Sequence, residues 1–269
     1  MRESLGAIAA VFRRDLRIAL TQPLGLVLRA FNAIVAISGV FFFARLIDVE
    51  RFAKLDHRVA NYFAYVTVNM AFTSLQATAL LAAARSVRDD QVQGTLEPIL
   101  ATQRHALLYV AACGLWPLAL GAFEVIVSLS TASLLGLDLR ATNLPSLVAF
   151  LVLGVLMMNA TGVLTAAAVI AFKRLPPSGY LIGGAAAFLA GTLFPVTLLP
   201  LPLRIASWCL PLTHALRGFR GATAGESLGV LWPDALWLAV ASLALAPVAA
   251  AALAAAAERG RRDGTLAHY

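Results

Sequence analysis

Charged residues are scarce in this chain of 269 residues, where Asp, Glu, Lys and Arg together make up only 13%. Soluble domains carry roughly 25% charged residues and roughly 45–50% apolar ones. Here hydrophobic residues reach 60%, which is more than one water-soluble core can bury. The sequence therefore predicts an integral membrane protein whose solvent is mostly lipid.

Cysteine and histidine are also rare, and neither forms a pattern that binds metal. The two cysteines, Cys113 and Cys209, lie in or beside apolar stretches and show no CxxC spacing. His105 and His214 stand alone at the borders of apolar stretches. Structural metal sites need several such ligands at close spacing. We therefore expect no metal site, and the cysteines are predicted to be packing residues.

The basic residues do not form a nucleic-acid patch, although the formal net charge is +7. They are scattered between apolar stretches, where Lys and Arg set membrane topology and meet anionic headgroups. Near the N-terminus, charged residues interrupt the region where a cleavable signal would carry its apolar core. We therefore expect no nucleic-acid partner and a first span that stays in the membrane.

Long apolar stretches are abundant. A spanning helix needs about 20 mostly apolar residues, and six stretches qualify: 24–44, 59–84, 106–137, 147–172, 178–199 and 235–257. An even number of spans puts both termini on one side. Segments on that side carry 12 Lys and Arg, against 8 in those on the other side. The positive-inside rule thus predicts one all-α transmembrane domain in the cell (inner) membrane, with both termini cytosolic.

Residues 1–22 are predicted to form an amphipathic helix at the membrane interface. At 100° per residue, Arg13, Arg14 and Arg17 lie opposite an apolar face. That face consists of Leu5, Ile8, Phe12, Leu16 and Ala19. Such a helix either anchors the topology or offers its basic face to a partner, and both readings stay open.

The charged stretch after the second predicted span indicates a helical elbow in the cytosol. The second helix is expected to continue into this stretch and to end at Gly94, and Thr95 is a good N-cap for a further short helix. The short helix carries apolar side chains that need a covering surface: Leu96, Ile99 and Leu100.

The stretch 194–217 is too apolar for a free loop and too often interrupted by proline for a single span. Non-helical backbone at membrane depth is tolerated only where protein or a water-filled cavity covers it. We therefore expect a re-entrant pair of short helices dipping from the outer surface. Its distinctive residues are Pro195, Pro200, Pro211, Thr213, His214 and Arg217.

These two stretches resemble a known family. Gly94-Thr95-Leu96-Glu97, with Ile99-Leu100-Ala101-Thr102, resembles the cytosolic coupling motif of type-2 ABC exporter permeases, and the stretch 194–217 resembles the signature before their last span. Six spans and an amphipathic N-terminal helix fit the same family. Two positions depart from its pattern, with Val92 in place of a glutamate and Gln103 in place of a proline. Asp89 and Asp90 are candidates to supply the missing negative charge.

The resemblance implies a complex of two permease chains, identical or homologous, with two separately encoded nucleotide-binding ATPase subunits. This chain contains no G-x-x-x-x-G-K-[ST] phosphate loop, so ATP and Mg²⁺ would bind on the partner ATPase. The chain itself is then neither an enzyme nor a cofactor-binding protein. The residues expected to couple it to the ATPase are Asp89, Asp90, Gly94, Thr95, Leu96, Glu97, Ile99, Leu100, Thr102, Arg13, Arg14 and Arg17.

Polar residues within the predicted spans are the candidates for a substrate pathway. Five on the second span share one helical face about 80° wide: Tyr62, Tyr65, Asn69, Thr73 and Gln76. They form either a wall that faces an amphipathic substrate (a drug, lipid or glycan) or hydrogen-bonding contacts between helices.

Glu124 is the carboxylate deep in the third span, and it is either functional or bonded to a neighbouring helix or to Arg29. Gly183, Ala187 and Gly191 indicate close helix packing in the fifth span.

Two other classes of protein remain as alternatives. A membrane scaffold without transport activity differs from an exporter in recruiting no ATPase. An intramembrane enzyme would need a Ser/His pair, a metal-ligand cluster or paired aspartates within the spans, and the sequence places none of these there. The identity of the cargo is not encoded in any motif of the chain.

Overall fold

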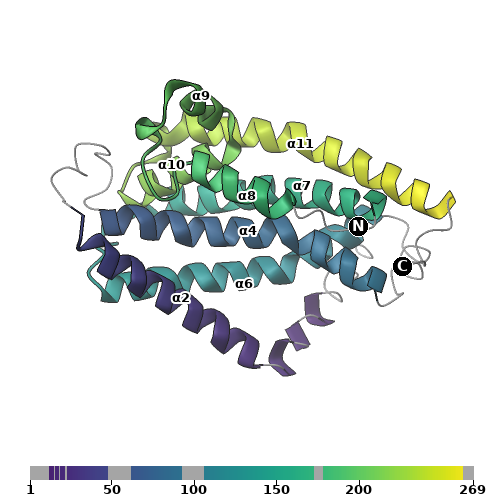
Figure 1. Cartoon of the computed structure of the whole chain (residues 1–269), viewed down its shortest axis with the longest axis horizontal. Helices are drawn as coiled ribbons and strands as arrows, with labels where there is room; N and C mark the ends of the chain where they lie inside the picture. Colours follow the sequence, from purple (N-terminus) through teal and green to yellow (C-terminus); the bar gives the residue numbers. More distant parts are fainter. Residues whose placement is uncertain are drawn as a thin grey trace.

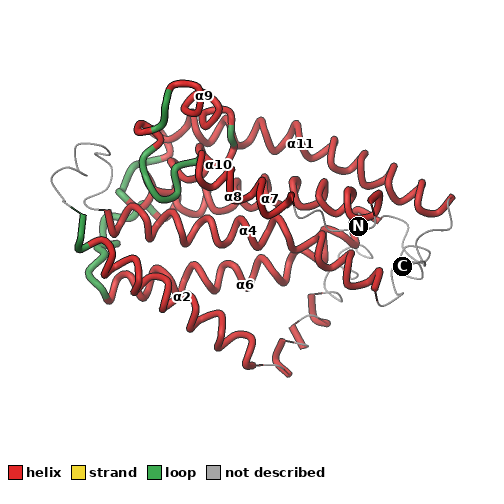
Figure 2. The backbone as a smooth tube through the Cα atoms, in the orientation of Figure 1, coloured by secondary structure: helices red, strands yellow, loops and turns green. Residues whose placement is uncertain are grey.

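The computed structural model describes residues 12–14, 16–17, 19–21, 23–47, 62–92, 106–172 and 178–262. This part of the chain consists of helices and loops, without strands (Figure 2). In chain order its main elements are α2 (Pro23–Ala44), α4 (Tyr62–Val92), α6 (Ala106–Leu134), α7 (Leu144–Phe172), α8 (Ser178–Leu189), the 3₁₀ helix η1 (Val196–Leu198), α9 (Leu201–Cys209), α10 (Pro211–Thr223) and α11 (Leu228–Arg262).

The long helices run alternately up and down one elongated bundle (Figure 1). Helix α4 lies at its centre and packs against α6 and α7, while α11 packs mainly on α7. Helix α2 crosses the bundle obliquely on the side of α6 and α4. Helices α9 and α10 lie at the end where α4 and α11 begin, which we call the cap end (Figure 1).

Four described helices are long and apolar enough to cross a membrane, judged by length and composition: Pro23–Ala44, Trp116–Leu134, Leu144–Ile170 and Leu228–Ala256. Only 6% to 33% of their most apolar windows is buried inside the chain. Apolar surface of that extent is favourable in lipid and costly in water. The all-helical architecture and these helices give the chain the general character of a membrane protein.

Five of the six predicted stretches coincide with a long helix to within a few residues at most ends. Helix α4 continues beyond the apolar stretch through the charged segment to Val92, as the sequence predicted. Helix α4 is not among the four helices above, all of which come from the described residues.

The predicted span 178–199 is wrong as a continuous helix, because α8 ends at Leu189. The amide of Gly191 donates to the Phe188 carbonyl and the amide of Thr192 to the Ala187 carbonyl. These two bonds form a Schellman motif, which needs a left-handed residue. Gly191 supplies it with φ of +76°. The predicted ridge of Gly183, Ala187 and Gly191 is therefore not one helical face.

The stretch predicted to hold a re-entrant pair of short helices contains three short elements, η1, α9 and α10. Pro195 is the N-cap of η1, Pro200 is the N-cap of α9, and Pro211 is the first residue of α10. Proline favours the start of a helix because its φ is already helical and no amide donor is lost there. Proline spacing therefore divides this apolar stretch into short helices.

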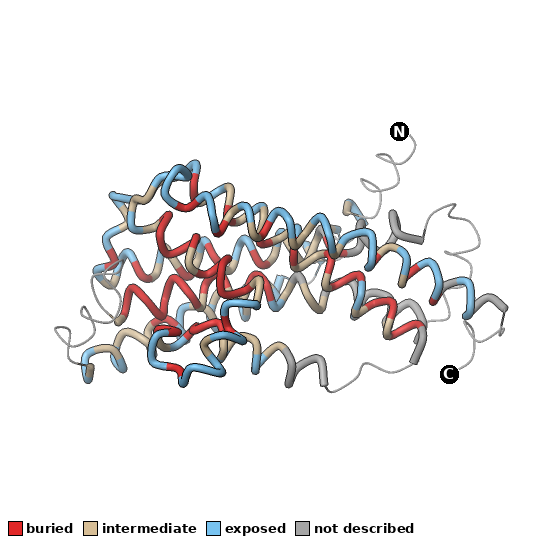
Figure 3. The backbone as a smooth tube through the Cα atoms, turned by 90° about the horizontal axis from the view of Figure 1, so that it is seen from above, coloured by how far each residue is buried: buried red, intermediate tan, exposed pale blue. Residues whose placement is uncertain are grey.

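The core lies where α4, α7 and α10 meet, and the outer faces of the bundle are mostly exposed (Figure 3). Ten of the 13 residues of α10 are buried. Gly218 allows this close approach, since a methyl group at that position would overlap the ring of Phe150 on α7. Phe219 stacks on Phe72 of α4 at 4.6 Å between ring centroids.

Candidate functional site

The five polar residues predicted to share one face of the second span lie on α4, and we call them the polar stripe. Two of them near the start of α4, Tyr65 and Asn69, bind the turn that follows α8. The Tyr65 hydroxyl donates to the Gly191 carbonyl at 2.6 Å. The Asn69 amide group donates to the carbonyls of Gly191 and Thr192 at 3.2 and 3.0 Å. Both carbonyls belong to buried residues beyond the end of α8. Buried backbone groups are costly without a hydrogen-bond partner, and these bonds provide one.

Arg220 of α10 completes this arrangement from the opposite side. Its Nη1 donates to Asn69 Oδ1 at 3.0 Å, and its guanidinium carbon lies 4.7 Å from the centroid of the Tyr65 ring. Arg220 is only 5% exposed. A buried guanidinium is costly unless it is hydrogen-bonded, and the Asn69 amide and the Tyr65 ring are among the groups that contact this one. Sequence reasoning missed Arg220 because it was counted as a charge in an outer loop.

Thr73 and Gln76, the two members of the polar stripe farther along α4, make no side-chain hydrogen bond to the described part of the chain. Gln76 is 3% exposed, yet neither atom of its amide has a hydrogen-bond partner in the described part of the chain. The Thr73 hydroxyl is likewise unpaired there. Tyr62, at the start of α4, packs near Phe43 of α2. The stripe thus contacts neighbouring helices of the same chain at Tyr65 and Asn69, while Gln76 keeps an unused amide.

His214, from the predicted signature, lies in a second polar cluster at the cap end. Its Nδ1 is 2.6 Å from Oδ1 of Asp234 on α11, and its Nε2 is 3.0 Å from the Trp208 carbonyl oxygen. The ring stacks on Trp237 at 4.7 Å and an interplanar angle of 15°. Both nitrogens lie within hydrogen-bond distance of an oxygen acceptor, so the ring is held between α9 and α11.

Arg217 and Thr213 extend this cluster. Arg217 Nη1 donates to the same Oδ1 of Asp234 at 3.2 Å, and its guanidinium lies over the Trp208 ring at 4.5 Å. The Thr213 hydroxyl donates to the Ser207 carbonyl at 2.6 Å. Together these contacts join α9, α10 and α11 into one unit. Asp234 is 5% exposed. Sequence reasoning missed it because it immediately precedes the predicted sixth span and matches no motif.

Glu124 forms an ion pair with Arg29, which is one of the partners that the sequence suggested for it. Their ion pair joins α6 to α2 at 2.6 Å between Glu124 Oε1 and Arg29 Nη1. The pair lies at the margin of a cavity of about 450 Å³ between α2, α4 and α6. An ion pair in a lipid-facing region lowers the cost of each charge, so this bond fixes α2 to the bundle.

The expected ATPase-coupling residues lie partly outside the described residues. Gly94, Thr95, Leu96, Glu97, Ile99, Leu100 and Thr102 all fall there, whereas Asp89 and Asp90 belong to the last turns of α4. In the described part of the N-terminal segment, Arg13, Arg14 and Arg17 are exposed, while Phe12, Leu16 and Ala19 are half-buried. Phe12 packs edge-on against Trp116 of α6 at 5.7 Å. The predicted amphipathic pattern therefore holds for these residues.

Among the described residues, no group of three or more His, Cys, Asp and Glu side chains could hold a metal ion. The site is thus a set of buried polar contacts that joins the start of α4 to the cap end, together with an ion-paired cavity on the flank. Comparison with protein-family models finds none that matches the chain, and comparison with curated proteins finds no relative.

Proposed function

We propose that this chain is the membrane-spanning permease subunit of an ATP-driven exporter. Two such chains, identical or homologous, would form the translocation pathway in the cell (inner) membrane, with cytosolic termini. Each would bind a separate ATPase subunit that holds ATP and Mg²⁺. The proposal rests on the resemblance of the segments 94–102 and 194–217 to type-2 exporter permeases, and on the length and continuity of α4.

The observation that carries the proposal is the continuity of α4. The helix begins at the cap end, where Tyr65 and Asn69 bond to the turn after α8. It runs without a break for 31 residues to Val92, two positions before Gly94. At 1.5 Å per residue that is about 45 Å, which exceeds the hydrocarbon thickness of a bilayer, about 30 Å. One rigid element thus connects the segment expected to meet the ATPase with the opposite end of the bundle.

This connection suggests how ATP binding could move the pathway. A push on the elbow around Leu96 and Glu97 would displace α4 along its length. Because Asn69 bonds both to the turn after α8 and to Arg220, the cap end would move with α4 rather than slide over it. The basic face of the N-terminal helix would provide a second contact with the ATPase. The cargo, by this proposal, is an amphipathic drug, lipid or glycan.

The test is ATP hydrolysis by the purified complex of the chain with an ATPase subunit encoded beside it. The double variant Leu96→Ala/Glu97→Ala is expected to lose either the complex or most of its hydrolysis. Glu258→Ala is the control, since it removes an exposed carboxylate from the C-terminal part of α11. Equal hydrolysis by the double variant and the wild-type complex would refute the assignment of the elbow.

A further inference from the structure

The cavity between α2, α4 and α6 lies apart from the contacts that support the proposed function. It has a volume of about 450 Å³, within the range of about 300–1,000 Å³ typical of ligand pockets. Residues from all three helices line it: Arg29, Asn32, Ala33, Ala36, Ile37, Met70, Ala71, Ser74, Glu124 and Ser128. Helix α2 buries only Ile37 in the bundle, so the cavity is bounded on one side by a peripheral helix.

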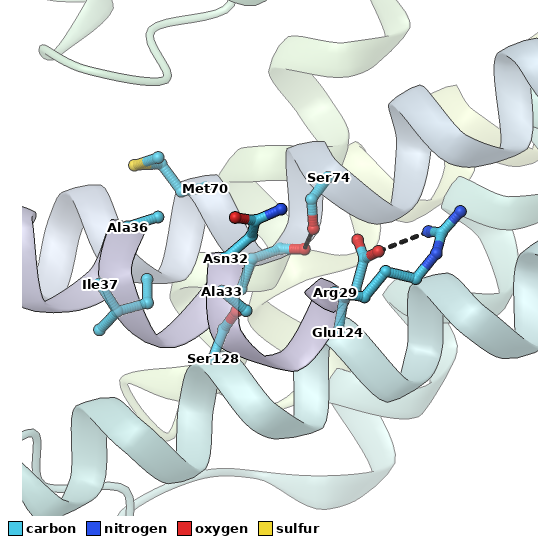
Figure 4. Close-up of a pocket in the computed structure, with 10 residues that line it drawn as sticks. Arg29, Asn32, Ala33, Ala36, Ile37, Met70, Ser74, Glu124 and Ser128 are labelled. Carbon is cyan, nitrogen blue, oxygen red and sulfur yellow. Dashed lines mark hydrogen bonds and ion pairs between the residues drawn. The ribbon is translucent and has the colours of Figure 1, made fainter. Parts of the chain in front are cut away.

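The lining is polar at one end and apolar at the other (Figure 4). Arg29 and Glu124 lie at the polar end, and Ile37 and Met70 lie at the apolar end. The side chains of Asn32, Ser74 and Ser128 lie between them. This graded lining is suited to an amphipathic molecule with a fixed direction.

Arg29 and Glu124, at the polar end, keep hydrogen-bond donors and acceptors that their ion pair does not fill. Glu124 Oε1 takes one N–H of Arg29, and no other hydrogen bond joins either side chain to the described part of the chain. A guanidinium has five N–H donors, and a carboxylate has about four acceptor positions. The Arg29 side chain is 40% exposed and that of Glu124 17%, so a ligand can reach both charges.

A paired Arg and Glu select for a ligand that carries both charges itself. A phosphate would gain charge-assisted hydrogen bonds from Arg29 but would be repelled by Glu124 if it had no positive group. An ammonium on the same ligand would meet Glu124 and remove that repulsion. Neither a purely anionic nor a purely cationic headgroup satisfies both side chains.

The direction of the cavity matches that of a lipid in one leaflet. Arg29 is six residues from the start of α2 at Pro23, or about 9 Å along the helix axis. Ile37 lies two further turns along α2, toward the middle of the span. A phospholipid in the leaflet at that end of the bundle has its headgroup near the membrane surface and its chains pointing inward, as the lining does.

We propose that this cavity binds one zwitterionic glycerophospholipid, with its phosphate on Arg29, its ammonium facing Glu124 and the start of its acyl chains over Ile37 and Met70. The proposal does not depend on transport. It concerns the flank of a single chain, and it would hold equally for a scaffold.

The test uses the full-length chain in detergent, incubated with equal amounts of phosphatidylethanolamine and phosphatidylglycerol and examined by native mass spectrometry. We expect one phosphatidylethanolamine per chain, with affinity about tenfold above that for phosphatidylglycerol, the factor expected for one additional hydrogen bond to a charged group. Equal binding of the two lipids would overturn the choice of a zwitterionic headgroup.

Two variants locate the lipid. Ala33→Phe fills the cavity without changing a charge and is expected to lose the lipid, whereas Val35→Phe adds the same ring to an exposed position of α2 and is expected to keep it. Arg29→Gln/Glu124→Gln removes both charges together and is expected to abolish the preference between the lipids. Retention of the preference by this double variant, or of the lipid by a folded Ala33→Phe, would overturn the site. If Ala33→Phe does not fold, the double variant decides.

A competition experiment distinguishes a bound lipid from a bound soluble phosphodiester. Glycerophosphoethanolamine has the same headgroup without acyl chains, so at millimolar concentration it is expected to leave the bound lipid in place. Full displacement would show that the headgroup alone binds, and the proposed lipid occupant would be wrong.

Discussion

Asn69 on α4 and Arg220 on α10 are 151 positions apart in the chain and are joined by a hydrogen bond of 3.0 Å. The same Asn69 donates to the carbonyls of Gly191 and Thr192. One amide thus connects the start of α4, the turn after α8 and the buried guanidinium of α10. Because the amide both donates and accepts, an apolar residue of similar size cannot replace it.

Asn69→Leu is therefore expected to destabilise the chain by about 2 kcal/mol, since it leaves two carbonyls and a guanidinium N–H with fewer partners. In a chain of this size that corresponds to an apparent melting temperature lower by roughly 5 °C. Gln76→Leu is the matched control on the same helix, because its amide has no partner in the described residues to lose. Equal melting temperatures of the two variants in detergent would contradict the role of Asn69.

The unpaired amide of Gln76 allows a separate test of the pathway. If Gln76 contacts cargo, Gln76→Leu is expected to lower transport while leaving the melting temperature unchanged. The measurement is ATP-dependent uptake of a fluorescent amphipathic dye and of a fluorescently labelled phospholipid into inside-out vesicles containing the complex. Uptake of both probes at the wild-type rate would remove Gln76 from the pathway and leave the stripe as packing between helices.

Gly191→Ala is expected to destabilise the turn after α8 by about 2 kcal/mol, the cost of a non-glycine residue in the left-handed region together with crowding. A Cβ at this position would lie 2.8 Å from the Phe194 carbonyl oxygen. Gly184→Ala is the control, because a Cβ there meets nothing within 4 Å and alanine is the better helix former. If the melting temperature of Gly184→Ala were equal to or lower than that of Gly191→Ala, the turn would differ from the one described.

Asp234→Asn is expected to lower stability by about 3 kcal/mol, because it removes the buried charge that faces both His214 and Arg217. Asp138→Asn makes the same chemical change at an exposed position, where the effect is expected to stay within about 0.5 kcal/mol. Limited proteolysis should then cut the segment around α9 faster in Asp234→Asn only. Similar cleavage of both variants would mean that Asp234 does not hold the cap end together.

The positions of five long helices followed from the sequence because uninterrupted apolar stretches must be helical in lipid, where each backbone group needs a partner within the helix. The short helices also followed, since Pro195, Pro200 and Pro211 each mark the start of one. The end of α8 did not follow. Hydropathy continues unchanged through Gly191 to Leu199, and a single glycine in an apolar stretch does not by itself predict a Schellman turn.

The partners of the polar residues were the harder part to predict. His214 and Asn69 can be identified from residue type and spacing. Arg220 counts only as a charge in an outer segment, and no pattern assigns a role to Asp234. His214 and Asp234 are 20 positions apart in the chain, and Asn69 and Arg220 are 151 positions apart. Pairs so far apart produce no local sequence pattern from which they could be predicted. The pair of Arg29 and Glu124 was a correct hypothesis because both charges lie alone in long apolar stretches, where each needs a partner of opposite charge.

If this chain works with a separate ATPase, the affinity-tagged chain can be purified in mild detergent together with an ATPase subunit encoded beside it. We expect a complex with equal numbers of the two chains, in which the second chain carries a phosphate loop and the complex hydrolyses ATP. If no such ATPase subunit co-purifies and none is encoded nearby, the exporter proposal is contradicted.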